Sequence, residues 1–209
     1  MTCAAPDAHW GAALDALRRY EACLKTLVDC RALPLVQVGG ARGCGAAAWP
    51  WFRDALLSGP APDAAVFLRR GERIGVADLD TLRRTLILRS LYARRSAVRR
   101  CIARTQLERM RAALGVEAFD ALVDWAGSDG ETVLPLPASL APRALAQDGL
   151  WRLRREDTLR SAALAQLIQC RLDGLPSDPP QPPAADDLPS AAEGERFITR
   201  LLSLIPTLS

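Results

Sequence analysis

Residues 69–114 read RRGERIGVADLDTLRRTLILRSLYARRSAVRRCIARTQLERMRAAL and form a basic, partly apolar segment in the middle of the chain. The segment holds thirteen arginines and four acidic residues, which gives it a net charge of +9. The rest of the 209-residue chain holds fourteen basic and twenty acidic residues, a net charge of −6, so the total is only +3. Two regions of opposite charge indicate a macromolecular partner rather than small-molecule chemistry.

The spacing of apolar residues after Asp78 predicts one long helix, with Asp78 as its N-cap and Gly115 as its end. One side of this helix carries Leu79, Leu82, Leu86, Ala93 and Ala97. The other side is also partly apolar, with Ile87, Leu88, Leu91, Val98 and Ile102. We therefore expect a central helix with neighbours on more than one face. Its arginines would lie at the edges of buried surface and pair with acidic residues elsewhere.

The residues before this segment predict shorter elements. An amphipathic pattern predicts a helix from Ala8 to about Arg31, which Pro34 prevents from continuing. Glycines at 39, 40, 43 and 45 indicate an irregular loop. A short helix is expected over 50–57, where Pro50 fits the first turn, and another over 63–71 with Asp63 as its cap.

The residues after the segment predict further helices. One covers 116–126 and stops at Gly127, residues 127–149 are expected to be an ordered connection, and a helix is expected from 150 to 172. Residues 174–190 contain six prolines and read as an extended linker. Ser190 and Glu193 then have the spacing of a capping box, and an apolar stripe follows at Phe197, Ile198, Leu201, Leu202 and Ile205. Such a helix can dock on its own domain or on a partner.

We therefore expect an all-α protein, with a compact multi-helix domain around a central arginine-rich helix. The expected divisions are a helical domain over 1–173, a proline-rich linker over 174–190, and a C-terminal amphipathic helix over 191–206. The sequence lacks a run of about 18 apolar residues that could span a membrane, and its start lacks the pattern of a secretory signal. Its six cysteines form no CxxC pair. These features predict a soluble intracellular protein with reduced thiols.

The sequence predicts no catalytic residue, metal site, cofactor or small-molecule substrate. His9 is the single histidine, and no Cys/His set has the spacing of zinc ligands. The glycine loop at 39–45 lacks the GK[ST] of a phosphate-binding loop, and there is no GxSxG motif. The neighbouring carboxylates Asp78 and Asp80, like Asp186 and Asp187, fit helix starts and linker better than a glycosidase pair.

Nucleic-acid binding is the alternative that the charge suggests, since a +9 segment could follow phosphates. Three features speak against it. The arginines do not keep to one helical face, Tyr92 is the only aromatic residue available for stacking, and the rest of the chain is acidic. The arginines could also serve mainly in pairs within the protein, which leaves an acidic protein partner as the other functional interpretation.

Residues 82–115, LRRTLILRSLYARRSAVRRCIARTQLERMRAALG, resemble the central segment of the SctK proteins of bacterial type III secretion systems, including the Hrp-type members. Those proteins carry a Leu-Arg-rich helix with an "LRR-I" type core and an "LG" stop. The matching residues here are Val98 to Ile102, followed by Leu114-Gly115. The aromatic group at 49–52 and the length of the chain also fit, whereas the proline linker and terminal helix have no match in the family.

The resemblance implies a non-enzymatic cytoplasmic adaptor at the inner-membrane base of the secretion apparatus. Its partners would be the cytosolic part of the inner-membrane ring protein SctD and the pod protein SctQ of the sorting platform. The family offers no catalytic residue to transfer. Together with the charge pattern and the terminal apolar stripe, this predicts a partner-binding set of eight residues: Arg83, Arg84, Arg94, Arg95, Arg99, Arg100, Phe197 and Leu201.

Overall fold

The structure, a computed structural model, describes residues 6–38, 60–125, 134–172 and 190–205, with side chains from residue 9 to 27 in the first range. The described residues form helices and contain no β-strand, which confirms the predicted all-α class. None of the helices in these ranges has the length and apolarity needed to cross a membrane. The chain divides into unit 1, residues 1–77 and 160–174, and unit 2, residues 78–159 and 175–209. The domain limits predicted from the sequence stay a prediction.

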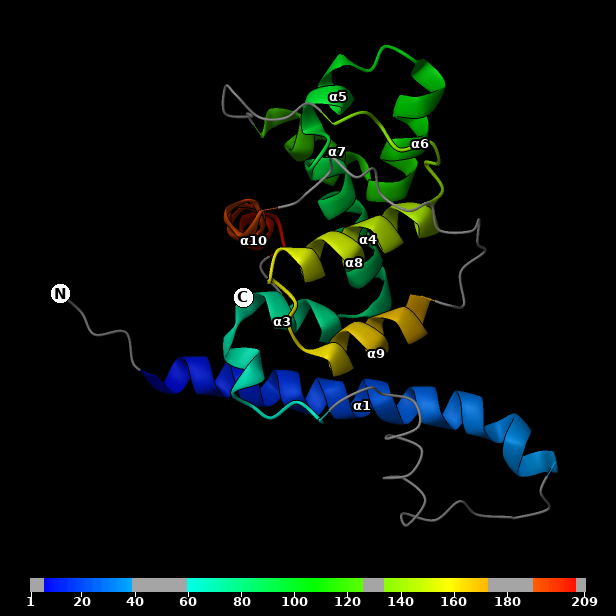
Figure 1. The fold of residues 1–209 in the computed structure, drawn as a ribbon, viewed down its shortest axis with the longest axis vertical. Coiled ribbons are helices and arrows are strands. Elements are labelled where there is room, and N and C mark those ends of the chain that lie inside the picture. Colours follow the sequence, from blue (N-terminus) through cyan, green and yellow to red (C-terminus); the bar gives the residue numbers. More distant parts are fainter. Residues whose placement is uncertain (1–5, 39–59, 126–133, 173–189, 206–209) are drawn as a thin grey trace. The chain divides into compact units, whose positions relative to one another are not determined.

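Unit 1 is built around the long helix α1 (Pro6–Val38). The short elements η1 (Val66–Leu68), α3 (Arg70–Arg73) and η2 (Ile74–Val76) follow one another, and η1 and η2 pack on α1. Helix α9 (Ala162–Leu172) completes the unit and contacts both η2 and α1 (Figure 1). Its core is formed by apolar side chains from α1, η1, η2 and α9, among them Tyr20, Leu24, Phe67, Ile74, Leu164 and Ile168.

Two polar side chains join the elements of unit 1 through hydrogen bonds to the backbone. The buried Glu72 accepts the backbone N–H groups of Arg160 (2.8 Å) and Ser161 (3.1 Å) just before α9. Burial raises the pKa of Glu72, although these two hydrogen bonds act in the opposite direction. Arg171, in the last turn of α9, donates to the carbonyls of Gly75 (3.0 Å) and Ala77 (2.7 Å). Carbonyl groups in and just after η2 that lack a backbone donor thus accept hydrogen bonds from a side chain of α9.

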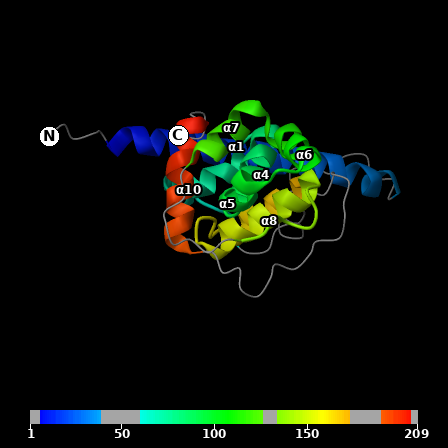
Figure 2. The same ribbon diagram turned by 90° about the horizontal axis from the view of Figure 1, so that it is seen from above.

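Unit 2 is organised around α4 (Leu79–Tyr92). Helix α8 (Pro142–Arg155) makes the most extensive contact with α4. Gly149 permits this approach, because a Cβ atom there would lie 1.9 Å from the backbone oxygen of Leu86. Around α4 also pack α5 (Arg95–Arg100), α6 (Arg104–Leu114), α7 (Val116–Asp124) and α10 (Ala191–Leu204). Figure 2 shows the first turns of α10 beside the C-terminal end of α8, where Gly194 lies close to Glu156 and Thr158.

Two of the three predicted caps are confirmed: Asp78 accepts the N–H of Thr81 at 2.9 Å, and Ser190 accepts that of Glu193 at 3.2 Å. Asp63 accepts the N–H of Val66 at 3.1 Å, but it precedes a turn, and the N-cap of η1 is Ala65. The predicted helix over 63–71 is instead a turn followed by η1 and α3. The expected loop at 39–45, the helix at 50–57 and nearly all of the linker at 174–190 lie outside the described residues.

The single long helix expected from Asp78 to Gly115 is wrong. It is three helices, α4, α5 and α6, interrupted at 93–94 and at 101–103. At the first break Arg94 leaves the helical conformation, with φ −113° and ψ 20°, and both Arg94 and Arg95 are buried, at 8% and 4% exposure. At the second break Cys101 and Ala103 have extended backbones. Ile102, expected to widen the apolar surface, is 95% exposed there.

Two other helix boundaries also differ from the prediction. Helix α1 continues through Pro34 to Val38, because a proline removes a single backbone donor and a helix can continue past it at a cost of about 3 kcal/mol. The helix expected over 150–172 is two helices, α8 and α9, separated by a turn in which Asp157 has φ 59°. Helix α8 begins at Pro142, eight residues before the expected start, at a position where proline fits the first helical turn.

Candidate functional site

The eight residues predicted to bind a partner all belong to unit 2, and the structure divides them into two groups. Arg94, Arg95, Phe197 and Leu201 are buried. Arg84, Arg99 and Arg100 are exposed, and Arg83 is half-buried. The buried group has partners within the protein, so its members hold the helices of unit 2 together. The partner-binding role of the whole set stays a prediction.

A buried ion cluster centred on Arg89 joins α4, the end of α8, and α10. The Arg89 guanidinium is fully buried and bridges to both carboxylate oxygens of Glu156: its Nε donates to Oε2 at 2.9 Å and its Nη2 to Oε1. The same Nη2 lies 3.2 Å from Oε1 of Glu193 on α10. Burial raises the pKa of Glu156 above its ordinary value, although Arg89 lowers it. The bidentate geometry orients the pair as well as attracting it.

A second ion cluster joins α4 to α8 through Asp148. This carboxylate accepts from both Nη atoms of Arg94, at 2.7 and 3.2 Å, and from Nε of Arg152 at 3.1 Å. The Ser90 hydroxyl donates to it at 2.6 Å. Burial alone would raise the pKa of Asp148, but the hydrogen bond from Arg94 and the two positive charges outweigh it, so the pKa lies below the ordinary value. The positive charges of Arg94 and Arg152 therefore both act on one half-buried carboxylate.

An aromatic cluster around Tyr92 holds α10 in place. The Tyr92 ring lies 5.5 Å from the ring of Phe197 on α10 and 5.6 Å from that of Trp125. Arg95 covers the Tyr92 ring at 4.5 Å and donates to the Tyr92 carbonyl, and burial lowers the pKa of Arg95. The cation of Arg89 lies 5.4 Å from the Phe197 ring. The terminal helix is thus docked on its own unit in this structure, one of the two possibilities left open by the sequence.

The sequence did not identify Asp148, Glu156 and Glu193 as partners of the arginines. A signal for the burial of Arg89 is present, since it lies in the apolar run from Leu86 to Leu91. An arginine in that position needs an acidic partner, because an unpaired buried charge is costly. Nothing in the local sequence says that the partner is 67 residues away.

Three exposed arginines of the segment lie where α5 ends and α6 begins. Arg99 and Arg100 occupy the last turn of α5, and Arg104 opens α6, where it pairs with Glu108 at 2.8 Å. Arg100 donates to the carbonyl of Ser96 at 3.1 Å. At the other end of this arginine series, Arg83 lies 3.6 Å from Asp80 on the surface of α4, a distance typical of a weak pair.

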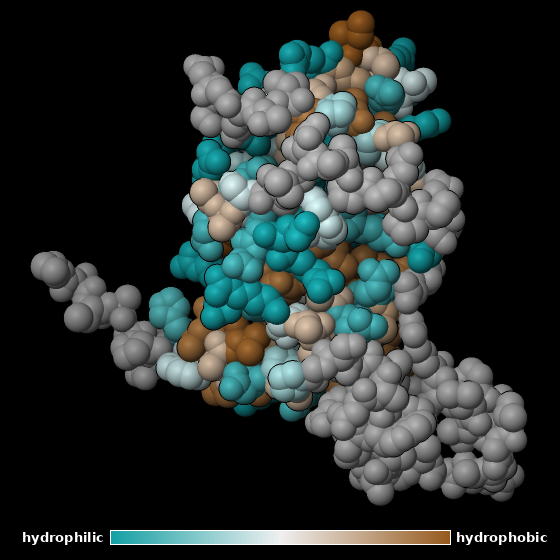
Figure 3. Space-filling model, in the orientation of Figure 1, coloured by the Kyte–Doolittle hydropathy of each residue, from teal (hydrophilic) through white to brown (hydrophobic). Residues whose placement is uncertain are grey.

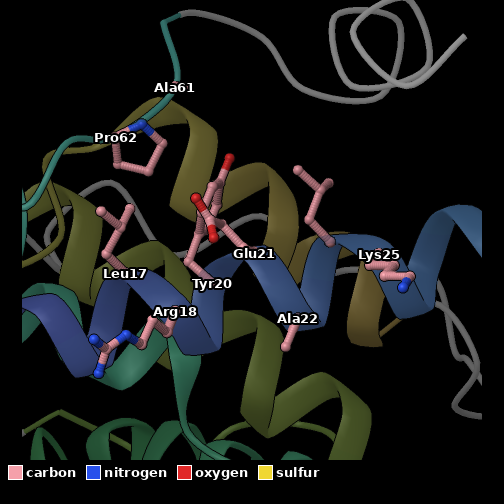
Figure 4. A pocket seen from close by; sticks show the side chains of 9 residues that line it. Leu17, Arg18, Tyr20, Glu21, Ala22, Lys25, Ala61 and Pro62 are labelled. Atoms are coloured by element: carbon pink, nitrogen blue, oxygen red, sulfur yellow. The ribbon is translucent and has the colours of Figure 1, made fainter. Parts of the chain in front are cut away.

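Within the described residues, no group of three His, Cys, Asp or Glu side chains could hold a metal ion. His9, the single histidine, is exposed on α1. A hollow of about 540 Å³ lies beside α1 in unit 1 and is lined by its polar and aliphatic side chains and by residues 61–62. In Figure 4 Leu17 lies beside Pro62, whereas Arg18 and Lys25 extend away from it. The lining holds one carboxylate, that of Glu21, and so does not bring two carboxylates together.

Residues 9–207 match the model of the family described as bacterial type III secretion protein (HrpB4). No curated protein matches, and no solved structure matches. The family match extends far beyond residues 82–115, on which the resemblance to SctK proteins was based, and it confirms that resemblance. It also includes residues 174–206, so the expectation that the proline linker and terminal helix have no match in the family is wrong.

Proposed function

The chain belongs to the HrpB4 family of bacterial type III secretion proteins, and from this premise we propose that it is a non-enzymatic adaptor of the secretion apparatus. It links the inner-membrane ring to the sorting-platform pods, with the cytosolic part of SctD and the pod protein SctQ as its partners. It works in the cytoplasm as a peripheral protein at the inner-membrane base. The observation that carries this proposal is the family match over residues 9–207.

Two features of the fold support an adaptor role. The chain forms two compact units, each with its own buried core, and each unit can present a separate surface to a separate partner. The arginine-rich segment uses Arg89, Arg94 and Arg95 inside unit 2, where they bind its helices together. These contacts fix the positions of the helices that carry the exposed arginines.

The burial of these arginines also disfavours nucleic-acid binding, the alternative function that the charge suggested. Three of the arginines between Thr81 and Leu107 are buried and cannot contact phosphates. Tyr92, the aromatic residue available in this part of the sequence, is buried between Trp125 and Phe197 and cannot stack on a base.

The experiment is a pull-down of the tagged full-length chain from cells that assemble the secretion apparatus, with and without nuclease, followed by mass spectrometry. We expect SctD or SctQ to be recovered in both cases. Recovery of nucleic acid, together with loss of all protein partners after nuclease treatment, would reverse the conclusion. A deletion strain complemented with the chain should regain secretion, which tests the role in the apparatus itself.

A further inference from the structure

The connection between α5 and α6 projects a single apolar side chain among arginines. We call Arg99, Arg100, Ile102 and Arg104 the α5–α6 corner. Ile102 is 95% exposed, more than any other large apolar residue in the described part of the chain. Figure 3 shows apolar surface at the tip of unit 2, where α5 meets α6, with hydrophilic side chains around it. At this exposure Ile102 buries almost no apolar area within the chain, so it contributes almost nothing to folding and is free to contact another molecule.

The corner is held in place from both sides. Before it, Val98 of α5 is buried, and the Cys101 N–H donates to the Val98 carbonyl at 3.1 Å. After it, the N–H of Gln106 donates to the Ala103 carbonyl at 3.0 Å, and the Cys101 thiol lies 3.3 Å from the Gln106 side-chain oxygen. Further along α6, Met110 and Leu114 are fully buried. The exposure of Ile102 is therefore fixed by the fold on either side of it.

The charge around Ile102 is positive. The sequence has no acidic residue between Asp80 and Glu108. Arg99 and Arg100 are exposed on one side of the corner, and Arg104 lies on the other with Glu108 as its partner. Arg99 contacts no acidic side chain within the described ranges. Guanidinium groups in such positions are suited to bidentate pairing with carboxylates on another molecule.

We propose that the α5–α6 corner is a docking point for a protein partner that offers a small apolar recess rimmed by carboxylates. Ile102 fills the recess, and Arg99 and Arg100 pair with its rim. This inference rests on the proposed adaptor function and assigns part of it to these residues. An apolar centre inside a charged rim is the arrangement in which a few residues supply most of the affinity of a protein interface.

The composition of the corner favours a protein over the two other anionic partners. A membrane surface is usually bound through a broad apolar helix face, whereas here one side chain projects from a three-residue connection. Nucleic acid would meet the arginines but would leave Ile102 in contact with water or phosphate, and the corner has no aromatic side chain on which a base could stack.

The test uses the purified full-length chain titrated calorimetrically with two purified probes, the cytosolic region of SctD and the pod protein SctQ. We expect at least one probe to bind. Ile102→Asp should then weaken that binding at least about tenfold, as should Arg99→Glu combined with Arg100→Glu. Ile102→Leu should bind within about threefold of the original chain, since it keeps an apolar side chain of equal size. The double charge reversal should also reduce the salt dependence of binding.

A matched control is Val116→Asp, which makes the same kind of change at another exposed apolar residue of unit 2, 63% exposed at the start of α7. It should leave binding unchanged, and far-UV circular dichroism should show that all variants keep the helical content of the original chain. Equal binding by Ile102→Asp and the original chain would overturn the role of the corner but leave the adaptor function standing.

Two further outcomes decide between the proposals. If the original chain binds neither probe, the adaptor function is refuted and the corner with it. The same variants are also tested on vesicles rich in phosphatidylglycerol. Loss of vesicle binding by Ile102→Asp, with protein binding retained, would assign the corner to a membrane surface and overturn the proposal.

Discussion

Replacing Arg89 by methionine tests whether the buried ion cluster holds α4, α8 and α10 together. Methionine keeps much of the side-chain length and removes the charge. Glu156, whose side chain is fully buried, then loses both of its hydrogen bonds from Arg89, and Glu193 loses the cation that lies 3.2 Å from it. The two carboxylates are left close to each other without the charge between them, and each raises the cost of ionising the other.

The expected loss of unfolding free energy at pH 7 is about 3–5 kcal/mol, the usual cost of removing one partner of a buried ion pair. This loss of unfolding free energy should also depend on pH. Burial already raises the pKa of Glu156 above 4.5 in the folded chain, and Arg89 opposes that rise. Without Arg89, the pKa of Glu156 in the folded chain rises further. A folded carboxyl with a raised pKa binds more protons than the unfolded one, so the variant should regain stability as the pH falls from 7 towards 4.5.

The assay is urea denaturation followed by far-UV circular dichroism at several pH values between 7 and 5, on the original chain and on Arg89→Met. A double variant that also carries Glu156→Gln provides the control, because it removes the carboxyl whose titration is at issue. It should be more stable than the single variant at pH 7 and depend less on pH. The reasoning is refuted if Arg89→Met costs less than about 1 kcal/mol at pH 7, or if the single and double variants respond equally to pH.

Three further predictions concern unit 2 and use the same denaturation measurement. Gly149→Ala should destabilise the chain by more than 2 kcal/mol, roughly, because its Cβ atom would lie 1.9 Å from the Leu86 oxygen; a neutral result would show that α4 and α8 are not this close. Phe197→Ala should cost about 3–5 kcal/mol and expose Tyr92 and Trp125, seen as a red shift of tryptophan fluorescence. Asp148→Asn should cost about 2 kcal/mol near pH 7. The pKa of Asp148 is lowered in the folded chain, so the ionised carboxylate stabilises the fold above pH 3.8, and this stabilisation is lost as the pH falls below that value. The unfolding free energies of the original chain and of Asp148→Asn should therefore become equal in acid.

Local sequence signals predicted the local features of the fold well. The apolar period of α10 and the capping residues Asp78 and Ser190 were correct, because caps and helix faces depend on residues within a few positions of one another. The breaks between α4, α5 and α6 were missed because apolar residues continue at helical spacing across them. Gly149 was interpreted as part of a connection, since its role depends on how closely α4 approaches, which no local pattern contains.

The candidate site was predicted less completely, for a related reason. Arginine count and spacing identify a basic segment, but which arginines stay at the surface depends on acids that come from other helices. Asp148 on α8 and Glu156 just after it are distant in sequence from Arg94 and Arg89, and the structure brings them together. The net charge of residues 69–114 therefore overstates the charge that a partner would meet.

This division of the arginines decides how the adaptor function has to be tested by charge reversal. Arg94→Glu or Arg95→Glu would place a carboxylate against Asp148 or on the face of Tyr92, and either change would destabilise unit 2 before any partner was involved. Loss of partner capture by such a variant would report on folding. Arg99 and Arg100 can be reversed without disturbing a buried pair, since both are exposed. A specific loss of binding with Arg99→Glu and Arg100→Glu, at unchanged stability, is therefore the result that separates a contact surface from a structural role. If these variants bind as the original chain does, the exposed arginines of α5 have no part in recognition.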